Sequence, residues 1–142
     1  CRSWLPDEVG AVAWFSFDNP GQSPRIPIFS GTMALPQSFR ICGQHRYRED
    51  AAIWSFREAN RLSAVNWDRG RKLLEPAVAE MEQKALAELP ALEERVKGLV
   101  KEGKNDEARK AVTEYTNAFA HGAMSRWQEM KAEFWQMFGR GF

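Results

Sequence analysis

The chain contains few of the residues that carry most enzyme chemistry. Its 142 residues include two cysteines, Cys1 and Cys42, and two histidines, His45 and His121. Cys42 and His45 form a C-x-x-H pair, but a zinc site needs about four ligands and no second pair is present. The glycine patterns of phosphate-binding loops and of nucleophile elbows are also missing. We therefore expect neither a metal nor a cofactor, and we expect His121 to be an ordinary helix residue.

Long apolar runs and a strong net charge are lacking as well. No run approaches the ~20 residues that a membrane-spanning helix needs, and the net charge is +1. Basic residues outnumber acidic ones by eight to four between positions 40 and 72, but no nucleic-acid motif or basic helix stripe accompanies them. We expect neither nucleic acid nor a membrane as a partner.

Aromatic residues are plentiful, and the chain has two distinct textures. Six tryptophans and nine phenylalanines must be buried inside this chain or against another one. Residues 1–47 are rich in Pro, Gly, Ser and aromatics, whereas residues 48–142 have a helical pattern with few breaks. The first part predicts strands over 11–17 and 25–29 joined by the turn-forming stretch "DNPGQSP", with loops before and after them. Pro27 cannot donate to a ladder, so the second strand is expected to lie at an edge or to be irregular there.

The second part predicts four helices. We expect the first to be capped by Asp50 and to end near position 65. We expect the second to follow the cap Asp68 and to end near Leu89, with either a kink or a late start at Pro76. The third is expected to begin at Pro90 and to end at Gly103. The fourth is expected to run from Asn105 or Asp106 to about Phe138. The last two helices should form a hairpin, with Glu93 and Lys97 as a surface pair on the third.

The last helix carries a wide apolar stripe that becomes aromatic toward its end. The stripe is Ala108, Val112, Tyr115, Phe119, Ala123, Trp127, Met130, Phe134 and Met137. One short partner helix is too small to cover this stripe. We therefore expect something else to lie against it.

Several separate motifs occur in one order along most of the chain. They are "RSWLP" (2–6), "G-A-V-x-W-F" (10–15), "DNP" (18–20), "S-P-x-I-P-I-F-S-G" (23–31), "LP-x-SF" (35–39) and "AAIW-x-F-R-x-x-N-R-L" (51–62). With these motifs the chain resembles the carboxy-terminal portion of dipeptidases of the C69 family, which are amino-terminal nucleophile hydrolases. The resemblance is strongest over residues 1–67.

The resemblance implies an α+β piece of an αββα hydrolase, in which residues 1–47 complete a sheet and residues 48–142 form a helical region. It implies that the whole enzyme hydrolyses dipeptides or short peptides through a cysteine thiolate that lies outside this chain. The "C-T" start and the "D-G-S" stretch typical of the family's nucleophile are absent here. A nucleophilic Cys1, activated by its own α-amine, is the competing hypothesis. A second alternative is a non-catalytic helical interaction module or a small subunit of a processed hydrolase.

Four polar residues lie inside the matched motifs, and they are candidates for holding one wall of a substrate cleft. They are Arg2, Asp18, Arg57 and Asn60. The alternative is that they form internal hydrogen bonds and salt bridges. The expected partners are a short peptide and the amino-terminal remainder of the same enzyme, and a homo-oligomer stays open. The compartment also stays open between an exported or periplasmic and a cytoplasmic bacterial location.

Overall fold

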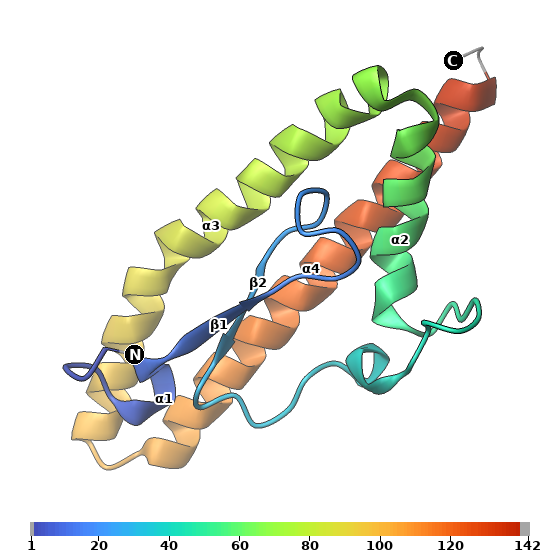
Figure 1. The fold of residues 1–142 in the computed structure, drawn as a ribbon. Helices are drawn as coiled ribbons and strands as arrows, with labels where there is room; N and C mark the ends of the chain where they lie inside the picture. Colours follow the sequence, from blue (N-terminus) through green and yellow to red (C-terminus); the bar gives the residue numbers. More distant parts are fainter. Residues whose placement is uncertain (1, 140–142) are drawn as a thin grey trace.

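Two long antiparallel helices form the body of the molecule, with a strand hairpin between them and a shorter helix against one of them (Figure 1). The computed structural model describes residues 2–139. As predicted, it is α+β and mostly helical, with a small antiparallel sheet first. None of the described helices is long and apolar enough to cross a membrane. The elements are α1 (Asp7–Gly10), β1 (Val12–Phe15), β2 (Ile26–Phe29), η1 (Gln37–Arg40), α2 (Ala52–Ser63), η2 (Ala64–Asn66), α3 (Trp67–Lys101) and α4 (Asn105–Gly139).

The helix α3 continues through both of its prolines, so the prediction of a separate helix beginning at Pro90 is wrong. A proline inside a helix removes one hydrogen bond and crowds the preceding turn, which costs about 3 kcal/mol. Because proline has no N–H, the carbonyl groups of Lys72 and Leu86, four residues before each proline, lack their helical donor. Lys72, Pro76, Leu86 and Pro90 are all exposed, so water has access to this side of the helix. The opposite side of α3 is buried at Gly70, Leu74, Ala77, Ala85, Leu92 and Val96. This packing on both sides of each proline keeps the helix continuous.

The predicted caps of α2 and α3 are also wrong. The start of α2 has no side-chain cap hydrogen bond, because Asp50 binds the guanidinium of Arg48 at 2.6 and 2.9 Å instead. The cap of α3 is Asn66, whose Oδ1 accepts a hydrogen bond from the backbone N–H of Arg69 at 3.3 Å. Asp68 lies inside the first turn of α3, where its negative charge suits the helix dipole.

The corner between α2 and α3 depends on a glycine. A Cβ added at Gly70 would lie 2.5 Å from the carbonyl oxygen of Ser63, which is far closer than van der Waals contact. The hydroxyl of Ser63 donates to the carbonyl of Asn60 at 2.8 Å. The absence of a side chain at Gly70 therefore lets α3 start directly against the end of α2.

The turn between α3 and α4 follows the prediction for Gly103. This residue adopts a φ of 76°, the left-handed conformation that glycine allows at a helix end. The backbone N–H of Lys104 donates to the carbonyl of Leu99 at 2.8 Å, and the N–H of Gly103 donates to that of Val100 at 2.9 Å. These bonds satisfy the last carbonyls of α3 and let the chain reverse into α4.

The two strands pair in an antiparallel register, with Val12 opposite Phe29 and Trp14 opposite Pro27. Both strands are shorter than predicted, and a short helix, α1, precedes them where a loop was expected. The backbone N–H of Ser30 donates to the carbonyl of Ala11 at 3.0 Å. Because bonded pairs alternate along an antiparallel ladder, the backbone groups of Trp14 and Pro27 face away from the partner strand.

The outer side of β2 is closed by α4, and the edge position predicted for Pro27 is confirmed. The carbonyl of Pro27 accepts a hydrogen bond from Thr116 Oγ1 of α4 at 2.9 Å. The N–H of Phe29 donates to Thr32 Oγ1 at 3.1 Å. A proline fits here because no ladder hydrogen bond is required of its nitrogen.

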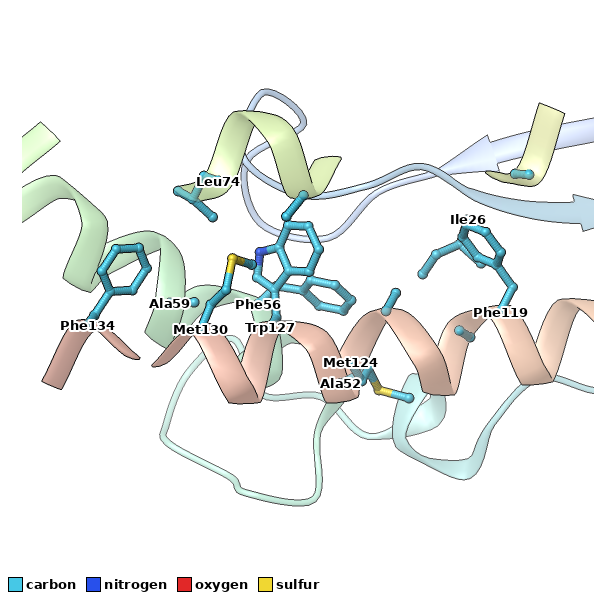
Figure 2. Close-up of a cluster of buried hydrophobic side chains, with 14 residues drawn as sticks. Ile26, Ala52, Phe56, Ala59, Leu74, Phe119, Met124, Trp127, Met130 and Phe134 are labelled. Carbon is cyan, nitrogen blue, oxygen red and sulfur yellow. The ribbon is translucent and has the colours of Figure 1, made fainter. Parts of the chain in front are cut away.

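The apolar stripe of α4 is buried by elements of this chain. The helix α2 and the strand β2 lie against α4 in addition to α3, so the expected extra cover is present within the molecule. Trp127, Met130 and Phe134 are fully buried, and Phe56 of α2 and Leu74 of α3 meet them (Figure 2). The core therefore has its centre on the carboxy-terminal half of α4.

A phenol–carboxylate bond links the two long helices at the middle of their contact. The hydroxyl of Tyr115 in α4 donates to Glu88 Oε2 in α3 at 2.9 Å. Burial of the ring and the nearby Glu88 carboxylate raise the pKa of Tyr115 well above its ordinary value of 10.0. The tyrosine therefore stays protonated and remains a donor throughout the neutral range.

We expect Phe134→Asp to lower the free energy of unfolding by about 4 kcal/mol or more, because it puts a carboxylate into a fully buried site. The neighbouring substitution Trp135→Asp is the matched control, since the Trp135 side chain is 60% exposed. Urea denaturation followed by circular dichroism measures both. Equal effects of the two substitutions would show that α4 does not bury the face described above.

We expect stability to fall as pH rises above about 10, because the unfolded phenol of Tyr115 loses its proton there while the folded one keeps it. Tyr115→Phe should remove this part of the pH dependence. Absorbance at 295 nm should show, in the wild type only, one phenol that ionises late. The same slope of stability against pH in both proteins would contradict the assignment.

Candidate functional site

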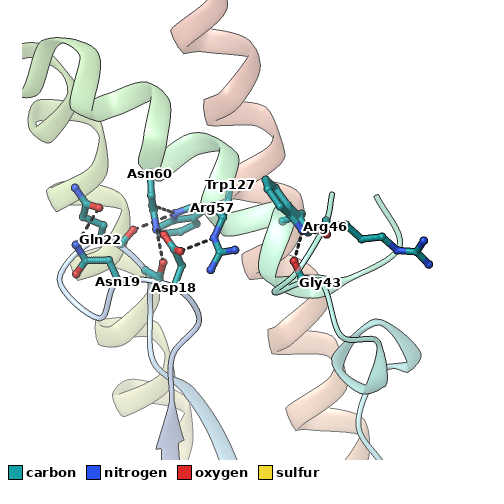
Figure 3. Close-up of polar contacts among 10 residues, drawn as sticks. Asp18, Asn19, Gln22, Gly43, Arg46, Arg57, Asn60 and Trp127 are labelled. Atoms are coloured by element: carbon teal, nitrogen blue, oxygen red, sulfur yellow. Dashed lines mark hydrogen bonds and ion pairs between the residues drawn. The ribbon is translucent and has the colours of Figure 1, made fainter. Parts of the chain in front are cut away.

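Three of the four candidate residues meet at the turn end of the strand hairpin formed by β1 and β2 (Figure 3). Asp18 follows β1, and Arg57 and Asn60 lie one turn apart on α2. Arg57 Nε donates to Asp18 Oδ1 at 2.8 Å, and Asn60 Nδ2 donates to Asp18 Oδ2 at 3.1 Å. Both carboxylate oxygens are thus held by side chains of α2, which joins motifs about 40 residues apart in the sequence.

The turn that presents Asp18 has an unusual backbone. Asp18 has a φ of 60°, and among residues 2–139 it is the only residue other than glycine with a positive φ. Asp and Asn visit this left-handed region more readily than other side chains do. Asn19 Oδ1 then accepts from the N–H of Gly21 at 2.9 Å, and Asn19 Nδ2 donates to Gln22 Oε1 at 3.1 Å. The "DNPGQ" stretch therefore folds into a side-chain-supported turn that aims the carboxylate at α2.

The polar network continues from Asn60 into the core. Asn60 Nδ2 also donates to Ser23 Oγ at 2.9 Å, and Asn60 Oδ1 accepts from Trp127 Nε1 at 3.2 Å. The same indole N–H lies 3.1 Å from the carbonyl of Gln22. Asn60 is only 2% exposed, so these bonds replace the water that it loses on folding.

Sequence reasoning missed two members of this network. Trp127 was assigned only to the apolar stripe of the last helix, although a buried indole also needs an acceptor for its N–H. Ser23 lies within the quoted "S-P" motif, but nothing in the sequence indicated that its hydroxyl faces Asn60. A tryptophan in an otherwise aliphatic and phenylalanine-rich stripe was the one available signal.

Charge in the network is balanced. The side chains of Asp18 and Arg57 are 12% and 20% exposed and form an ion pair. Arg57 also lies over the ring of Trp54, with its Cζ 5.3 Å from the ring centroid. Trp54 is itself held by hydrogen bonds from its Nε1 to the carbonyls of Gly43 and Arg46, at 2.7 and 3.1 Å. Each oxygen of the Asp18 carboxylate thus accepts one hydrogen bond from a side chain of α2, and its charge is neutralised by Arg57, so the carboxylate anchors the turn to α2.

A cavity of about 420 Å³ lies beside the network. Asp18, Asn60 and Arg61 contribute its polar groups, and Ala64 and Pro20 contribute apolar ones. Asn19 and Gln22 complete the lining, which holds no cysteine, serine or histidine. The cavity offers hydrogen-bonding groups and the guanidinium of Arg61, which has no ion-pair partner among residues 2–139, and this set suits binding rather than covalent chemistry.

The fourth candidate, Arg2, lies elsewhere. Its Nη1 is 2.5 Å from Glu93 Oε1 of α3, although neither Glu93 Oε1 nor Arg2 Nη2 has an aligned hydrogen-bond partner within residues 2–139. The expected Glu93–Lys97 pair is therefore wrong, and Lys97 instead binds Glu94 at 2.6 Å. Arg2 fastens the start of the chain to α3 and is not part of the Asp18 network.

The residues with nucleophilic or ligating side chains are scattered. Cys1 lies outside the described residues, so its predicted role is not addressed by the fold. Cys42 is a free, exposed thiol, and His45 is exposed in the same loop. His121 is exposed on α4, as expected of an ordinary helix residue. No three His, Cys, Asp or Glu side chains among residues 2–139 are placed to share a metal ion.

Comparison of the chain with models of protein families, with curated proteins and with solved structures gives no match. Function is therefore inferred from the geometry of the site and from the motif residues that build it.

We expect Asp18→Asn to lower the free energy of unfolding by about 2–3 kcal/mol, because it removes the charge that compensates the largely buried Arg57. Asparagine tolerates the left-handed backbone, so strain does not contribute to the loss. Asp50→Asn is the matched control, because it breaks an exposed Asp–Arg pair and should leave the midpoint unchanged. Similar urea midpoints for the two variants would show that the network is not an anchor.

Proposed function

We propose that this chain is the carboxy-terminal portion of a cysteine dipeptidase, in which it supplies scaffold and one wall of the substrate cleft. The observation that carries the proposal is the convergence of three separate motif segments on Asp18 and Asn60. Motifs that share a family pattern and also share one buried network form a single structural unit. Their agreement supports the resemblance beyond the letters of any one motif.

The proposal assigns the reactive groups to polypeptide outside this chain, so Cys1 is not the nucleophile. The thiolate of a terminal cysteine attacks the carbonyl carbon of the peptide bond, and its α-amine accepts the thiol proton and passes it to the leaving amine. Water then attacks the thioester carbonyl, which releases the acyl product and restores the thiol. The described residues provide no such thiol and base in contact, and their polar groups fit orientation of a peptide rather than its cleavage.

The outer edge of β1 supports the idea that residues 1–47 complete a larger sheet. The register places the backbone N–H and C=O of Val12 and Trp14 on the side away from β2. The other edge of the sheet is closed by Thr116 and Thr32. Open strand edges pair readily with another strand, so this edge is where the proposed remainder of the sheet would add. Phe15, which ends β1, is 42% exposed and would be covered by such an addition.

A second candidate function is a helical interaction module, or the small subunit of a processed hydrolase. The hairpin of α3 and α4 favours it, because part of its surface forms an open groove. Such a module would not require the charge-balanced network around Asp18, whereas an enzyme wall has a use for its rigidity and for the cavity beside it.

The test compares the 142-residue chain with the product of the complete reading frame that encodes it, on a panel of dipeptides. We expect the complete product to release free amino acids and the isolated chain to release none, with Cys1→Ser unchanged from the isolated chain. Asp18→Asn in the complete product should lower kcat/KM at least tenfold, because the wall loses its fixed position.

Two outcomes would overturn the proposal. Hydrolysis by the isolated chain that disappears in Cys1→Ser would place the nucleophile in this chain. A reading frame that adds no cysteine-nucleophile segment, together with no hydrolysis of any peptide, would leave the interaction module as the function.

A further inference from the structure

An open groove runs between the long helices at their middle. It has a volume of about 600 Å³ and is lined by one face of α3, from Met81 to Arg95, and one face of α4, from Tyr115 to Gly122. None of the residues of the Asp18 network lines it. The groove is therefore separate from the candidate site.

The floor of the groove is apolar, and its rim on α4 is low. Met81, Leu92 and Phe119 form the floor. Ala118 and Gly122 form the α4 rim and are exposed, and a Cβ added at Gly122 meets no atom within 4 Å. A trough with one rim this low is too open to enclose a small molecule, which usually buries most of its surface in its pocket. It can receive a helix, because small rim residues let a third helix approach closely.

The groove has a charge at each end of its α3 side. Lys84 and Arg95 line it, and neither has an ion-pair partner in the described part of the chain. Glu88 lies between them and accepts a hydrogen bond from the hydroxyl of Tyr115. The groove therefore carries two free positive charges and one carboxylate that is already engaged. This arrangement calls for a partner with negative charges at two separated points.

The spacing of the two cations defines that partner. Lys84 and Arg95 are eleven residues apart on one helix, which places their Cα atoms ~16 Å apart at about 1.5 Å per residue. Eleven residues is also three turns of a partner helix, so acids at positions i and i+11 lie on one face of it. Apolar residues at i+4 and i+7 on the same face would cover the floor.

We propose that this groove docks an amphipathic helix of a partner protein whose binding face carries acidic residues eleven positions apart with apolar residues between them. Its affinity comes from burial of the apolar floor, and its register comes from the ion pairs at the two ends. The proposal holds independently of whether the chain belongs to a dipeptidase.

A second copy of this chain fits the groove less well. Among α2, α3 and α4, the required spacing occurs once, as Glu82, Leu86, Leu89 and Glu93 of α3. Glu82 already binds Arg25 at 2.8 Å and Glu93 already binds Arg2 at 2.5 Å. Docking of that face would break the ion pairs that tie Arg2 and Arg25 to α3, so a foreign helix is favoured.

The test uses two labelled synthetic helical peptides in fluorescence anisotropy. One carries Glu at two positions eleven apart and Leu at the fourth and seventh positions after the first Glu. The other carries Lys in place of both Glu. We expect the wild-type chain to bind the Glu peptide at least tenfold more tightly than the Lys peptide, and added salt to reduce the difference.

Charge reversal gives the decisive comparison. The double variant Lys84→Glu, Arg95→Glu should reverse the preference between the two peptides. The matched control Lys72→Glu, Lys101→Glu changes two exposed lysines of the same helix outside the groove and should leave the preference unchanged. Gly122→Leu should weaken the binding of both peptides at least tenfold, because the new side chain occupies the groove. The circular dichroism spectrum should stay the same, because a Cβ at this position meets no atom of the chain within 4 Å.

Three results would overturn the proposal. The first is that the wild-type chain binds both peptides with equal affinity, or binds neither of them. The second is self-association of the wild-type chain that Gly122→Leu abolishes, which would make the occupant a second copy. The third is displacement of the bound Glu peptide by a fatty acid at micromolar concentration, which would assign the groove to a small anionic amphiphile.

Discussion

The position of Trp127 constrains the rest of the molecule. Its ring is fully buried and lies against Phe56, with ring centroids 5.7 Å apart. Its N–H must find an acceptor in the same interior, and it finds Asn60 Oδ1 and the carbonyl of Gln22. An indole N–H left without an acceptor there would cost about 1–3 kcal/mol. Trp127 therefore joins the loop after β1, the helix α2 and the helix α4 through one side chain.

The same constraint explains why the motif residues are spread over the chain yet act together. The side-chain oxygen of Asn60 accepts a hydrogen bond from Trp127, and its side-chain nitrogen donates to Asp18 and Ser23. Asp18 in turn neutralises Arg57. Each of these side chains has a hydrogen-bond or ion-pair partner within the set, so the set is held in one arrangement. A function in positioning, with the reactive thiol supplied by other polypeptide, is consistent with that chemistry.

The hairpin of α3 and α4 presents two unlike faces. One face packs on the strands and α2, and it contains the aromatic core. The other retains a groove because alanine and glycine take the places that larger side chains would need to fill it. The molecule thus combines an interior that is closed by its own elements with a strand edge and a helical trough that are open.

Much of the secondary structure was predictable from local signals. The turn residues after position 17, the apolar strands around them, the periodic stripe of the last helix and the stop at Gly103 are properties of short segments. Asp18, Arg57 and Asn60 were predicted as candidates because they lie inside the motifs, but their contacts with one another were not predicted. The partner Trp127 was not foreseen, because 67 residues separate it from Asn60 and no local pattern links them.

The amino-acid sequence by itself determined the strand hairpin, the turn after β1 and the helical character of the second part, because side-chain periodicity and the backbone limits of proline and glycine act within a few residues. Tertiary structure alone decided that α3 runs through Pro76 and Pro90, that Asp50 binds Arg48 rather than capping α2, and where the groove lies. Those outcomes depend on which groups are buried and which reach water, and burial exists only once distant segments have packed together.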